Sequence, residues 1–193
     1  MAEPVSSRPK PKAPGDSGLG RRVEQMLRVD HAGEYGAVAI YRGQRAVFER
    51  AMRTRGLARE IKAMERQEQA HLDAFDALLL ARRVRPTALA PVWGAAGYAL
   101  GVATALLGPR AAHACTEAVE TVIEGHYGAQ VDELERAEAE SELKAAFASF
   151  QADEIAHKDA AVAAGARDVP GYPLLSALIC LGCRAAIRLS EKL

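Results

Sequence analysis

Hydrophobic positions recur along the chain every three or four residues, which is the period of an α helix with one buried face. One stripe consists of Ile61, Met64, Glu68, His71, Phe75 and Leu78. A second consists of Leu143, Phe147, Phe150, Glu154, His157 and Ala161. Two more, with a spacing of seven, are Leu27, Glu34, Tyr41 and Phe48, and His113, Glu120, Tyr127 and Leu134. The pattern predicts four helices and places four glutamates and two histidines at core positions.

The prolines divide the chain into two blocks in which long helices are allowed. Residues 15–85 and 110–169 contain no proline, the residue that helix interiors exclude. Thr54-Arg55-Gly56 predicts a break in the first block, which gives helices near 20–54 and 57–84. The polar stretch 136–141 predicts the second break, which gives helices near 110–136 and 141–165. Two helical hairpins, and hence an all-α four-helix bundle, follow from this division.

Two uncharged segments lie outside these helices. Residues 87–108 reach the length of a membrane span but are rich in glycine and alanine and contain a proline. Residues 169–183 are too short to span and are followed by one basic residue per helical turn, Arg184, Arg188 and Lys192. We expect two apolar helices that associate with a membrane without crossing it. The alternative is that both helices cap a soluble core.

Composition is consistent with one domain of helices. The chain has 193 residues, of which 49% are hydrophobic and 5% aromatic, a balance that favours alanine- and leucine-rich helices. Its formal net charge is zero, so no nucleic-acid partner is expected. Residues 1–19 are rich in proline, serine and lysine and are expected to form a disordered tail. Residues 20–193 then form the bundle, with the apolar insert 87–108 and a C-terminal interfacial helix over 170–193.

The three cysteines, Cys115, Cys180 and Cys183, are too few for a disulfide framework, which favours a reducing compartment. Cys180 and Cys183 form a C-x-x-C pair inside an apolar run that contains no second pair. We expect them to be helix packing residues and not a zinc or redox site.

A short motif occurs twice. EQAHLDA at 68–74 and EIAHKDA at 154–160 share the pattern E-x-x-H-x-D-A and lie 86 positions apart. The same offset relates two further pairs, Glu34 with Glu120 and Tyr41 with Tyr127. We infer a duplicated helical hairpin, with E-x6-Y on its first helix and E-x-x-H on its second.

The buried glutamates and histidines point to metal. Burying one unpaired carboxylate costs on the order of several kcal/mol, and two divalent cations would offset four of them. A Glu from each of two helices, with Glu-x-x-His from each of the other two, is the ligand set of ferritin-like di-iron and di-manganese proteins. Oxygen-rich ligation with imidazole suits iron or manganese, and the absence of cysteine argues against zinc thiolate. The predicted metal ligands are Glu34, Glu68, His71, Glu120, Glu154 and His157.

Several nearby residues compete for these roles. Glu117 and Glu124 flank Glu120 at one-turn spacing, but only Glu120 satisfies the repeat. Asp30 is a candidate to orient a ligand histidine from behind. Three histidines have no partner in the repeat and are expected on a helix surface or in the core: His31, His113 and His126.

Four segments of the chain resemble the demethoxyubiquinone hydroxylase family from about residue 20 to the C-terminus. They are LRVDHAGEYGAVAIYRGQ, MERQEQAHLDAF, ACTEAVETVIEGHY and CRAAIRLSEKL. The resemblance implies a ferritin-like monooxygenase of ubiquinone biosynthesis with two iron ions per subunit, which hydroxylates the demethoxyubiquinone ring using molecular oxygen and two electrons. The family's metal ligands fall on the six residues that the repeat selects. Glu68 and Glu154 are our candidates for bridging ligands, with Glu34 and Glu120 terminal.

The resemblance also implies further roles and partners. Tyr127 is the candidate catalytic residue, which would position the quinone ring or relay a proton, whereas Tyr41 is expected only to pack. The substrate carries a polyprenyl tail, so we expect a membrane lipid surface as a partner, on the cytoplasmic face of a bacterial inner membrane or the matrix side of the mitochondrial inner membrane. The sequence does not decide whether the partners include further copies of the chain or other ubiquinone-biosynthesis proteins. NADH, a reductase and the quinol are open as electron donors because the sequence contains no nucleotide-binding fingerprint.

Other classes of protein could use the same bundle. A soluble ferritin-like ferroxidase or rubrerythrin-like peroxide scavenger would have the same ligands but no need for two apolar segments. A helical scaffold would bind no stoichiometric iron. A di-iron hydroxylase of modified tRNA is weakly disfavoured by the neutral charge.

Overall fold

The structure, a computed structural model, describes residues 18–192, which form an all-helical bundle without β strands in that range. The all-α prediction is therefore confirmed there, whereas the predicted tail 1–19 lies almost wholly outside the described residues. The helices are α1 (Gly18–Phe48), α2 (Arg55–Arg82), α3 (Ala90–Leu106), α4 (Pro109–Arg136), α5 (Ser141–Ala163) and α6 (Tyr172–Ser190), with 3₁₀ turns η1 (Met52–Thr54) and η2 (Ala166–Asp168).

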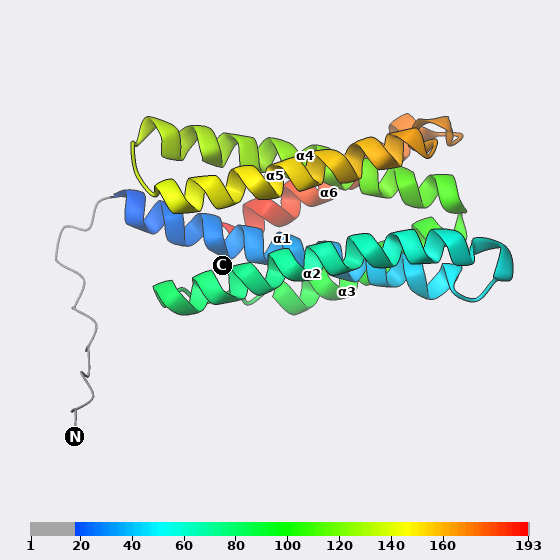
Figure 1. Cartoon of the computed structure of the whole chain (residues 1–193), viewed down its shortest axis with the longest axis horizontal. Helices are drawn as coiled ribbons and strands as arrows, with labels where there is room; N and C mark the ends of the chain where they lie inside the picture. The colour runs from blue at the N-terminus through cyan, green and yellow to red at the C-terminus, as the bar shows by residue number, and fades with distance from the viewer. Residues whose placement is uncertain (1–17, 193) are drawn as a thin grey trace, which may run out of the picture.

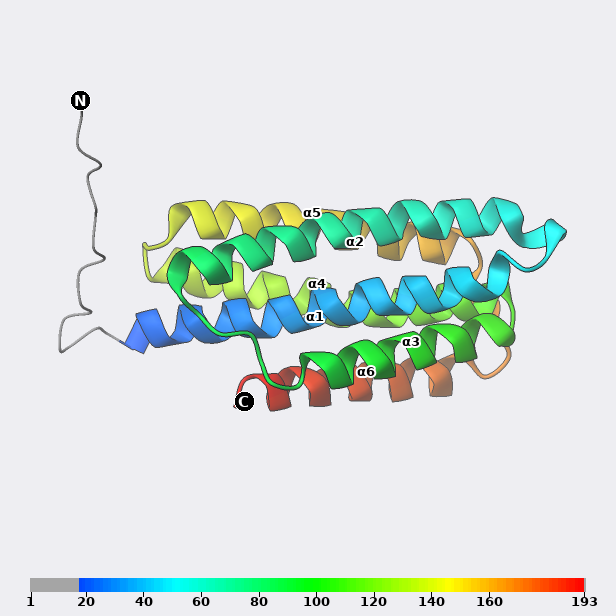
Figure 2. The same ribbon diagram turned by 90° about the horizontal axis from the view of Figure 1, so that it is seen from below.

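The helices form three layers of two (Figures 1 and 2). Helices α2 and α5 make one outer layer, α1 and α4 the middle layer, and α3 and α6 the other outer layer. Backbones approach closely within the hairpins α1–α2 and α4–α5, and much less closely between one hairpin and the other. Large side chains can therefore fill the space between the hairpins, where the core stripes meet.

The helix breaks agree only in part with the sequence prediction. Helix α1 ends at Phe48 and not near residue 54, because Thr54 Oγ1 donates to the carbonyl oxygens of Phe48 (2.7 Å) and Ala51 (3.0 Å) and so satisfies the end of the helix. The second break is where the polar stretch predicted it, and Glu138 and Glu140 there adopt positive φ angles of 49° and 54°.

Glycines allow α3 to lie close against α1. A Cβ atom added to Gly101 would overlap the carbonyl oxygen of Ile40, and one added to Gly43 would overlap that of Tyr98. The glycine content of the apolar insert 87–108 therefore has a packing cause. Helix α6, beside α3 in the outer layer, covers α4, and the cysteines pack between α4 and α6 without a disulfide among the described residues.

The outer face of α3 and α6 is apolar and exposed. Its large exposed side chains are Val92, Tyr98, Leu106, Leu107, Leu174, Leu178, Leu181 and Leu189. Within residues 18–192, α6 is the one helix long and apolar enough, by length and composition alone, to cross a membrane, and α3 is apolar but shorter. The layer of α3 and α6 thus exposes large apolar side chains of the kind that the core of the bundle buries.

The close approach of α3 to α1 gives a testable expectation for stability. Gly101→Ala should lower the free energy of unfolding by about 1–3 kcal/mol, because the added methyl group overpacks the contact with Ile40. Gly125→Ala on α4 is the control, since no atom lies within 4 Å of its added Cβ, and it should stabilise by about 0.5–1 kcal/mol. Chemical denaturation of both variants measures the difference. Equal stabilities would contradict the packing argument.

Candidate metal centre

The six predicted ligand residues converge between the two hairpins. Glu34 comes from α1, Glu120 from α4, and the two E-x-x-H pairs from α2 and α5. All six side chains are buried. They form two groups whose ligand atoms lie within 4.8 Å of one another: Glu34, Glu68, His71 and Glu154, and Glu68, Glu120, Glu154 and His157. Each group could hold a metal ion, and both groups contain Glu68 and Glu154.

Each histidine faces the carboxylate of the opposite hairpin more closely than its own. His71 Nδ1 lies 3.3 Å from Glu154 Oε1 and 3.8 Å from Glu68 Oε2. His157 Nδ1 lies 2.9 Å from Glu68 Oε1 and 3.5 Å from Glu154 Oε2. The cluster is therefore assembled across the interface between the hairpins, and neither hairpin holds a complete group.

The atoms at the centre of the cluster have no hydrogen-bond partner in the protein. These buried atoms are Glu68 Oε1, both carboxylate oxygens of Glu154, His71 Nδ1 and His157 Nδ1. Leaving a buried polar atom unpaired costs about 1–3 kcal/mol, so five such atoms facing one another demand another partner. Carboxylate oxygens and imidazole nitrogens are ligands that suit iron or manganese, and the residues therefore fit a pair of such cations.

Two residues that the sequence reasoning missed orient the histidines. His71 Nε2 lies 3.1 Å from Asp153 Oδ2, and His157 Nε2 lies 3.1 Å from Gln67 Oε1. These hydrogen bonds turn each Nδ1 toward the centre of the cluster. Gln67 and Asp153 directly precede the two E-x-x-H motifs and are 86 positions apart, so the repeat contained the signal that could have identified them.

The two repeated tyrosines hold the outer glutamates. Tyr41 Oη donates to Glu120 Oε1 at 2.9 Å, and Tyr127 Oη donates to Glu34 Oε1. Each tyrosine thus serves the glutamate of the other hairpin. The expectation that Tyr41 only packs was wrong, because it also makes this hydrogen bond. The catalytic role of Tyr127 stays a prediction.

The competing acidic residues lie elsewhere. Glu117 accepts hydrogen bonds from Tyr172 Oη (2.7 Å) and Arg167 (3.2 Å), and Glu124 forms an ion pair with Lys158. Both are held by the surrounding helices and not by the cluster.

The expectation that Asp30 orients a ligand histidine was wrong. Its Oδ1 lies 2.9 Å from Nε2 of His126, which is not one of the predicted ligands. Both ligand histidines have their orienting partners on the helices that carry the E-x-x-H motifs.

Without metal, burial and the mutual repulsion of the carboxylates favour protonation of the cluster. Burial raises the pKa of three carboxyls, and neighbouring carboxylates add to the effect: Glu34, Glu68 and Glu120. Burial would also raise the pKa of Glu154, but the close approach of the two histidines lowers it. Burial would lower the pKa of His71, but Glu154 and Glu34 raise it to about 11. Binding of cations must displace these protons.

The cluster lies beside an apolar groove formed with the outer layer. A cavity of about 20 Å³ borders the four glutamates and Tyr127, and a groove of about 560 Å³ lies between α3 and α6. The two are lined in common by Val29, Gly33, Ala37, Ile123 and Ile187. The cavity beside the buried carboxylates and the groove, which is lined almost wholly by apolar side chains, therefore share a wall formed by α1, α4 and α6.

These features define an all-helical bundle protein with a buried carboxylate–histidine cluster able to hold a metal ion. The family model described as ubiquinone biosynthesis protein COQ7 matches residues 21–190. The chain belongs to this family, which confirms the resemblance seen in its motifs.

Three relatives illustrate the similarity. The 3-demethoxyubiquinol 3-hydroxylase of Rhodospirillum rubrum is 46% identical over 181 residues, covering 94% of this chain and 83% of the relative. The NADPH-dependent 3-demethoxyubiquinone 3-hydroxylase, mitochondrial, of Rattus norvegicus is 48% identical over 172 residues, covering 88% and 77%. The 5-demethoxyubiquinone hydroxylase, mitochondrial, of Saccharomyces cerevisiae is 39% identical over 184 residues, covering 89% and 78%.

The cluster predicts that metal binding depends on Glu154 and not on Asp159, two residues of the same E-x-x-H-x-D-A motif. In an anaerobic Fe(II) titration, Glu154→Ala should lose one or both ions, because Glu154 belongs to both groups. Asp159→Ala, an exposed position of the same motif, should bind as wild type does. Because binding displaces protons, wild-type affinity should rise from about pH 6 to about pH 7.5. Equal loss in both variants would contradict the assignment.

Proposed function

We propose that this chain is an oxygen-dependent di-iron hydroxylase that acts on the demethoxyubiquinone ring in a late step of ubiquinone biosynthesis. The observation that carries the proposal is the buried carboxylate–histidine cluster, whose small cavity shares a wall with an apolar groove. Family membership and the names of the relatives, which are hydroxylases of demethoxyubiquinone or its quinol, support the reaction and the substrate.

The proposed cofactor is two iron ions per subunit in a ferritin-like bundle. The ligands are those predicted from the repeat: Glu34, Glu68, His71, Glu120, Glu154 and His157. Glu68 and Glu154 would bridge, because they are the two members that the two groups share. When bound, the iron pair supplies the oxygen activation and the electron transfer that ring hydroxylation needs.

Hydrogen bonds from other residues of the chain would fix the orientation of the metal ligands. The Gln67 and Asp153 contacts fix the imidazoles, and the tyrosine hydroxyls fix the outer carboxylates. Burial raises the pKa of Tyr127 well above its usual value, so its Oη keeps a proton beside Glu34. Tyr127 also lines the small cavity that adjoins the groove. The catalytic role proposed for it is to position a ring that approaches from the groove or to pass on that proton.

The groove suits a quinone with a polyprenyl tail. Its apolar lining from α3 and α6 would contain the tail, while the ring would reach the carboxylates between Gly33, Ala37 and Ile123. Gly33 and Ala37, which line both the cavity and the groove, have small side chains. The ring would therefore approach the metal from the membrane-facing side of the bundle.

The exposed apolar face of α3 and α6 is proposed to lie on the membrane that contains the quinone. Arg184, Arg188 and Lys192 follow the apolar part of α6 and are exposed, as expected for contacts with lipid headgroups. The rat and yeast relatives are named mitochondrial, which supports the matrix side of the mitochondrial inner membrane. The other proposed location is the cytoplasmic face of a bacterial inner membrane.

The function is tested by turnover. Iron-loaded protein with a demethoxyubiquinone of natural tail length, a reductant and oxygen should form the hydroxylated quinone, as measured by mass spectrometry. Gly36→Leu has room for its Cβ, since no atom lies within 4 Å of it, and should reduce turnover about tenfold or more because the rest of the side chain fills the groove. Circular dichroism and thermal unfolding check that the variant is folded. Gly125→Leu, also free of such contacts but outside the groove, is the matched control.

Absence of hydroxylated product from iron-loaded wild type would overturn the proposed function. Normal turnover by Gly36→Leu would show that the substrate does not use the groove. Glu154→Ala should be inactive in the same assay.

Membrane attachment is tested with vesicles. Replacing Leu174 and Leu181 together by Asp should weaken binding to vesicles of phosphatidylcholine and phosphatidylglycerol at least tenfold, because each leucine contributes about 1.5–3 kcal/mol when buried in lipid. Leu80→Asp is the control, since Leu80 is 82% exposed but lies on α2 in the opposite layer. Co-sedimentation measures binding, and equal sedimentation of the double variant and wild type would refute this orientation.

A further inference from the structure

One polar cluster beside the metal centre breaks the symmetry of the duplicated hairpins. The ligands, the tyrosines and the residues that orient the histidines all recur at an offset of 86, but the offset relates Asp30 to Thr116 and His126 to Ile40. The third pair, Gln130 and Gln44, keeps its residue type but not its contact, because Gln44 bonds the carbonyl of Ala112. Metal binding does not need this difference, so another role must account for it.

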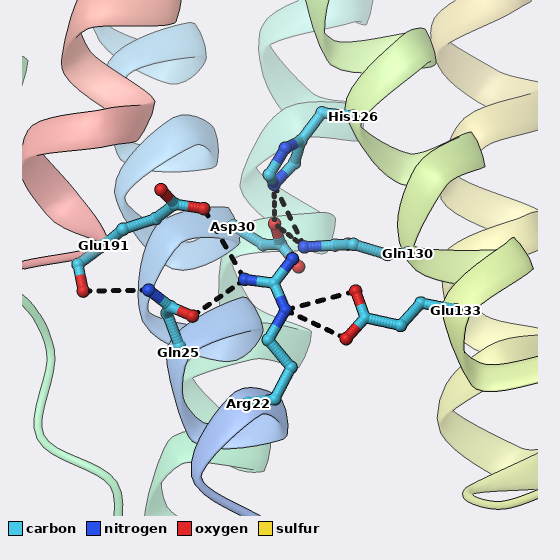
Figure 3. Close-up of polar contacts among 7 residues, drawn as sticks. All are labelled: Arg22, Gln25, Asp30, His126, Gln130, Glu133 and Glu191. Atoms are coloured by element: carbon cyan, nitrogen blue, oxygen red, sulfur yellow. Dashed lines mark hydrogen bonds and ion pairs between the residues drawn. The ribbon is translucent and has the colours of Figure 1, made fainter. Parts of the chain in front are cut away.

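The cluster joins α1 to α4 through one carboxylate oxygen (Figure 3). Asp30 Oδ1 lies 2.9 Å from His126 Nε2 and 2.9 Å from Gln130 Nε2. The Asp30 side chain is fully buried. Its second oxygen, Oδ2, has no hydrogen-bond partner in the protein, and neither does Gln130 Oε1. Both unpaired atoms are acceptors, so the partner that this cluster fits is a donor.

The position of the cluster identifies which donor could reach it. Asp30 and His126 line the same small cavity as Glu34 and Tyr127, and that cavity adjoins the groove. A hydroxyl on a ring in the groove is a group small enough to reach this cavity, where Asp30 and the metal-binding glutamates are both lining residues. The related position on the opposite hairpin, with Thr116 and Ile40, contains no charged group.

A second set of contacts holds this end of the bundle in place (Figure 3). Arg22 Nε lies 3.1 Å from both carboxylate oxygens of Glu133 on α4, and Arg22 donates to Gln25 at 2.8 Å. Gln25 in turn donates to the backbone carbonyl of Glu191, directly after α6, at 3.1 Å. Helices α1, α4 and α6 are thus fixed to one another around the Asp30 cluster.

We propose that Asp30 recognises the substrate ring, with its Oδ2 accepting a hydrogen bond from a ring hydroxyl, so that the site prefers the quinol to rings with acceptors only. His126 and Gln130 are positioning residues, because their hydrogen bonds to Oδ1 leave Oδ2 free. The proposal rests on the proposed function, since it takes the ligand of the groove to be a quinol ring.

Two redox-inert probes test the preference for a donor. 4-Decylphenol and 4-decylanisole have the same ring and tail, and only the phenol can donate a hydrogen bond. Trp93 is the single tryptophan of the chain and lines the groove, so its fluorescence reports occupancy by either probe. Titrations use iron-loaded Fe(II) protein under nitrogen. Wild type should bind the phenol about tenfold more tightly than the anisole.

The variants locate the preference. In Asp30→Asn the amide oxygen would stay with His126 and Gln130, which places an NH₂ donor where Oδ2 lies, so the preference should fall below about twofold or reverse. Anisole affinity should stay unchanged, which shows that the groove is intact. Thr116→Val, at the related position of the other hairpin, should keep the wild-type preference. In turnover, Asp30→Asn should raise the KM for the quinol about tenfold with a smaller change in kcat.

Three results would overturn the proposal: no preference in wild type, a preference for the anisole, or an undiminished phenol preference in Asp30→Asn. The test separates this proposal from the proposed function. A phenol preference that depends on Asp30, found in a protein that forms no hydroxylated quinone, would support ring recognition by Asp30 and refute the hydroxylase.

Discussion

Four carboxylates and two imidazoles buried at one point of an apolar bundle are the constraint on which the rest of the structure depends. Protons or cations must compensate their negative charge. The raised pKa values of three of the glutamates indicate that protons do so in the metal-free protein. The spacing between the hairpins, the cross-hairpin tyrosines and the partners of the histidines all follow from keeping these groups buried, oriented and unpaired at the centre.

The sequence predicted the centre better than its surroundings, for a physical reason. Glu68 and Glu154 belong to helices whose period fixes their faces, and the offset of 86 supplied the partners, so position in the repeat was sufficient. The pairing of Asp30 with His126 crosses two helices and has no counterpart in the repeat, so only the packing of α1 on α4 reveals it. The end of α1 at Phe48 depends on a hydroxyl six residues away, which helix periodicity cannot indicate.

The third layer, α3 and α6, lies between the buried cluster and the exposed apolar face of the molecule. Helices α3 and α6 leave apolar side chains exposed outside and enclose an apolar groove inside, so the same two helices serve both the proposed membrane contact and the proposed substrate path. Glycines in α3 make this possible, because they bring its backbone against α1 and leave the groove beside it. A layer that only capped a soluble core would not need an apolar outer face.

The contacts across the hairpins have a consequence for how such a molecule can arise. Each hairpin contributes one glutamate to the ligand group of the other hairpin and one tyrosine that bonds the other hairpin's outer glutamate. One hairpin alone therefore cannot make the centre, whereas two identical copies about a twofold axis could. Joining the copies in a single chain removes the requirement that they stay identical. Only then can one side of the metal centre have Asp30 and His126 while the related positions on the other side are Thr116 and Ile40. The two sides of an otherwise symmetric centre then differ in chemistry.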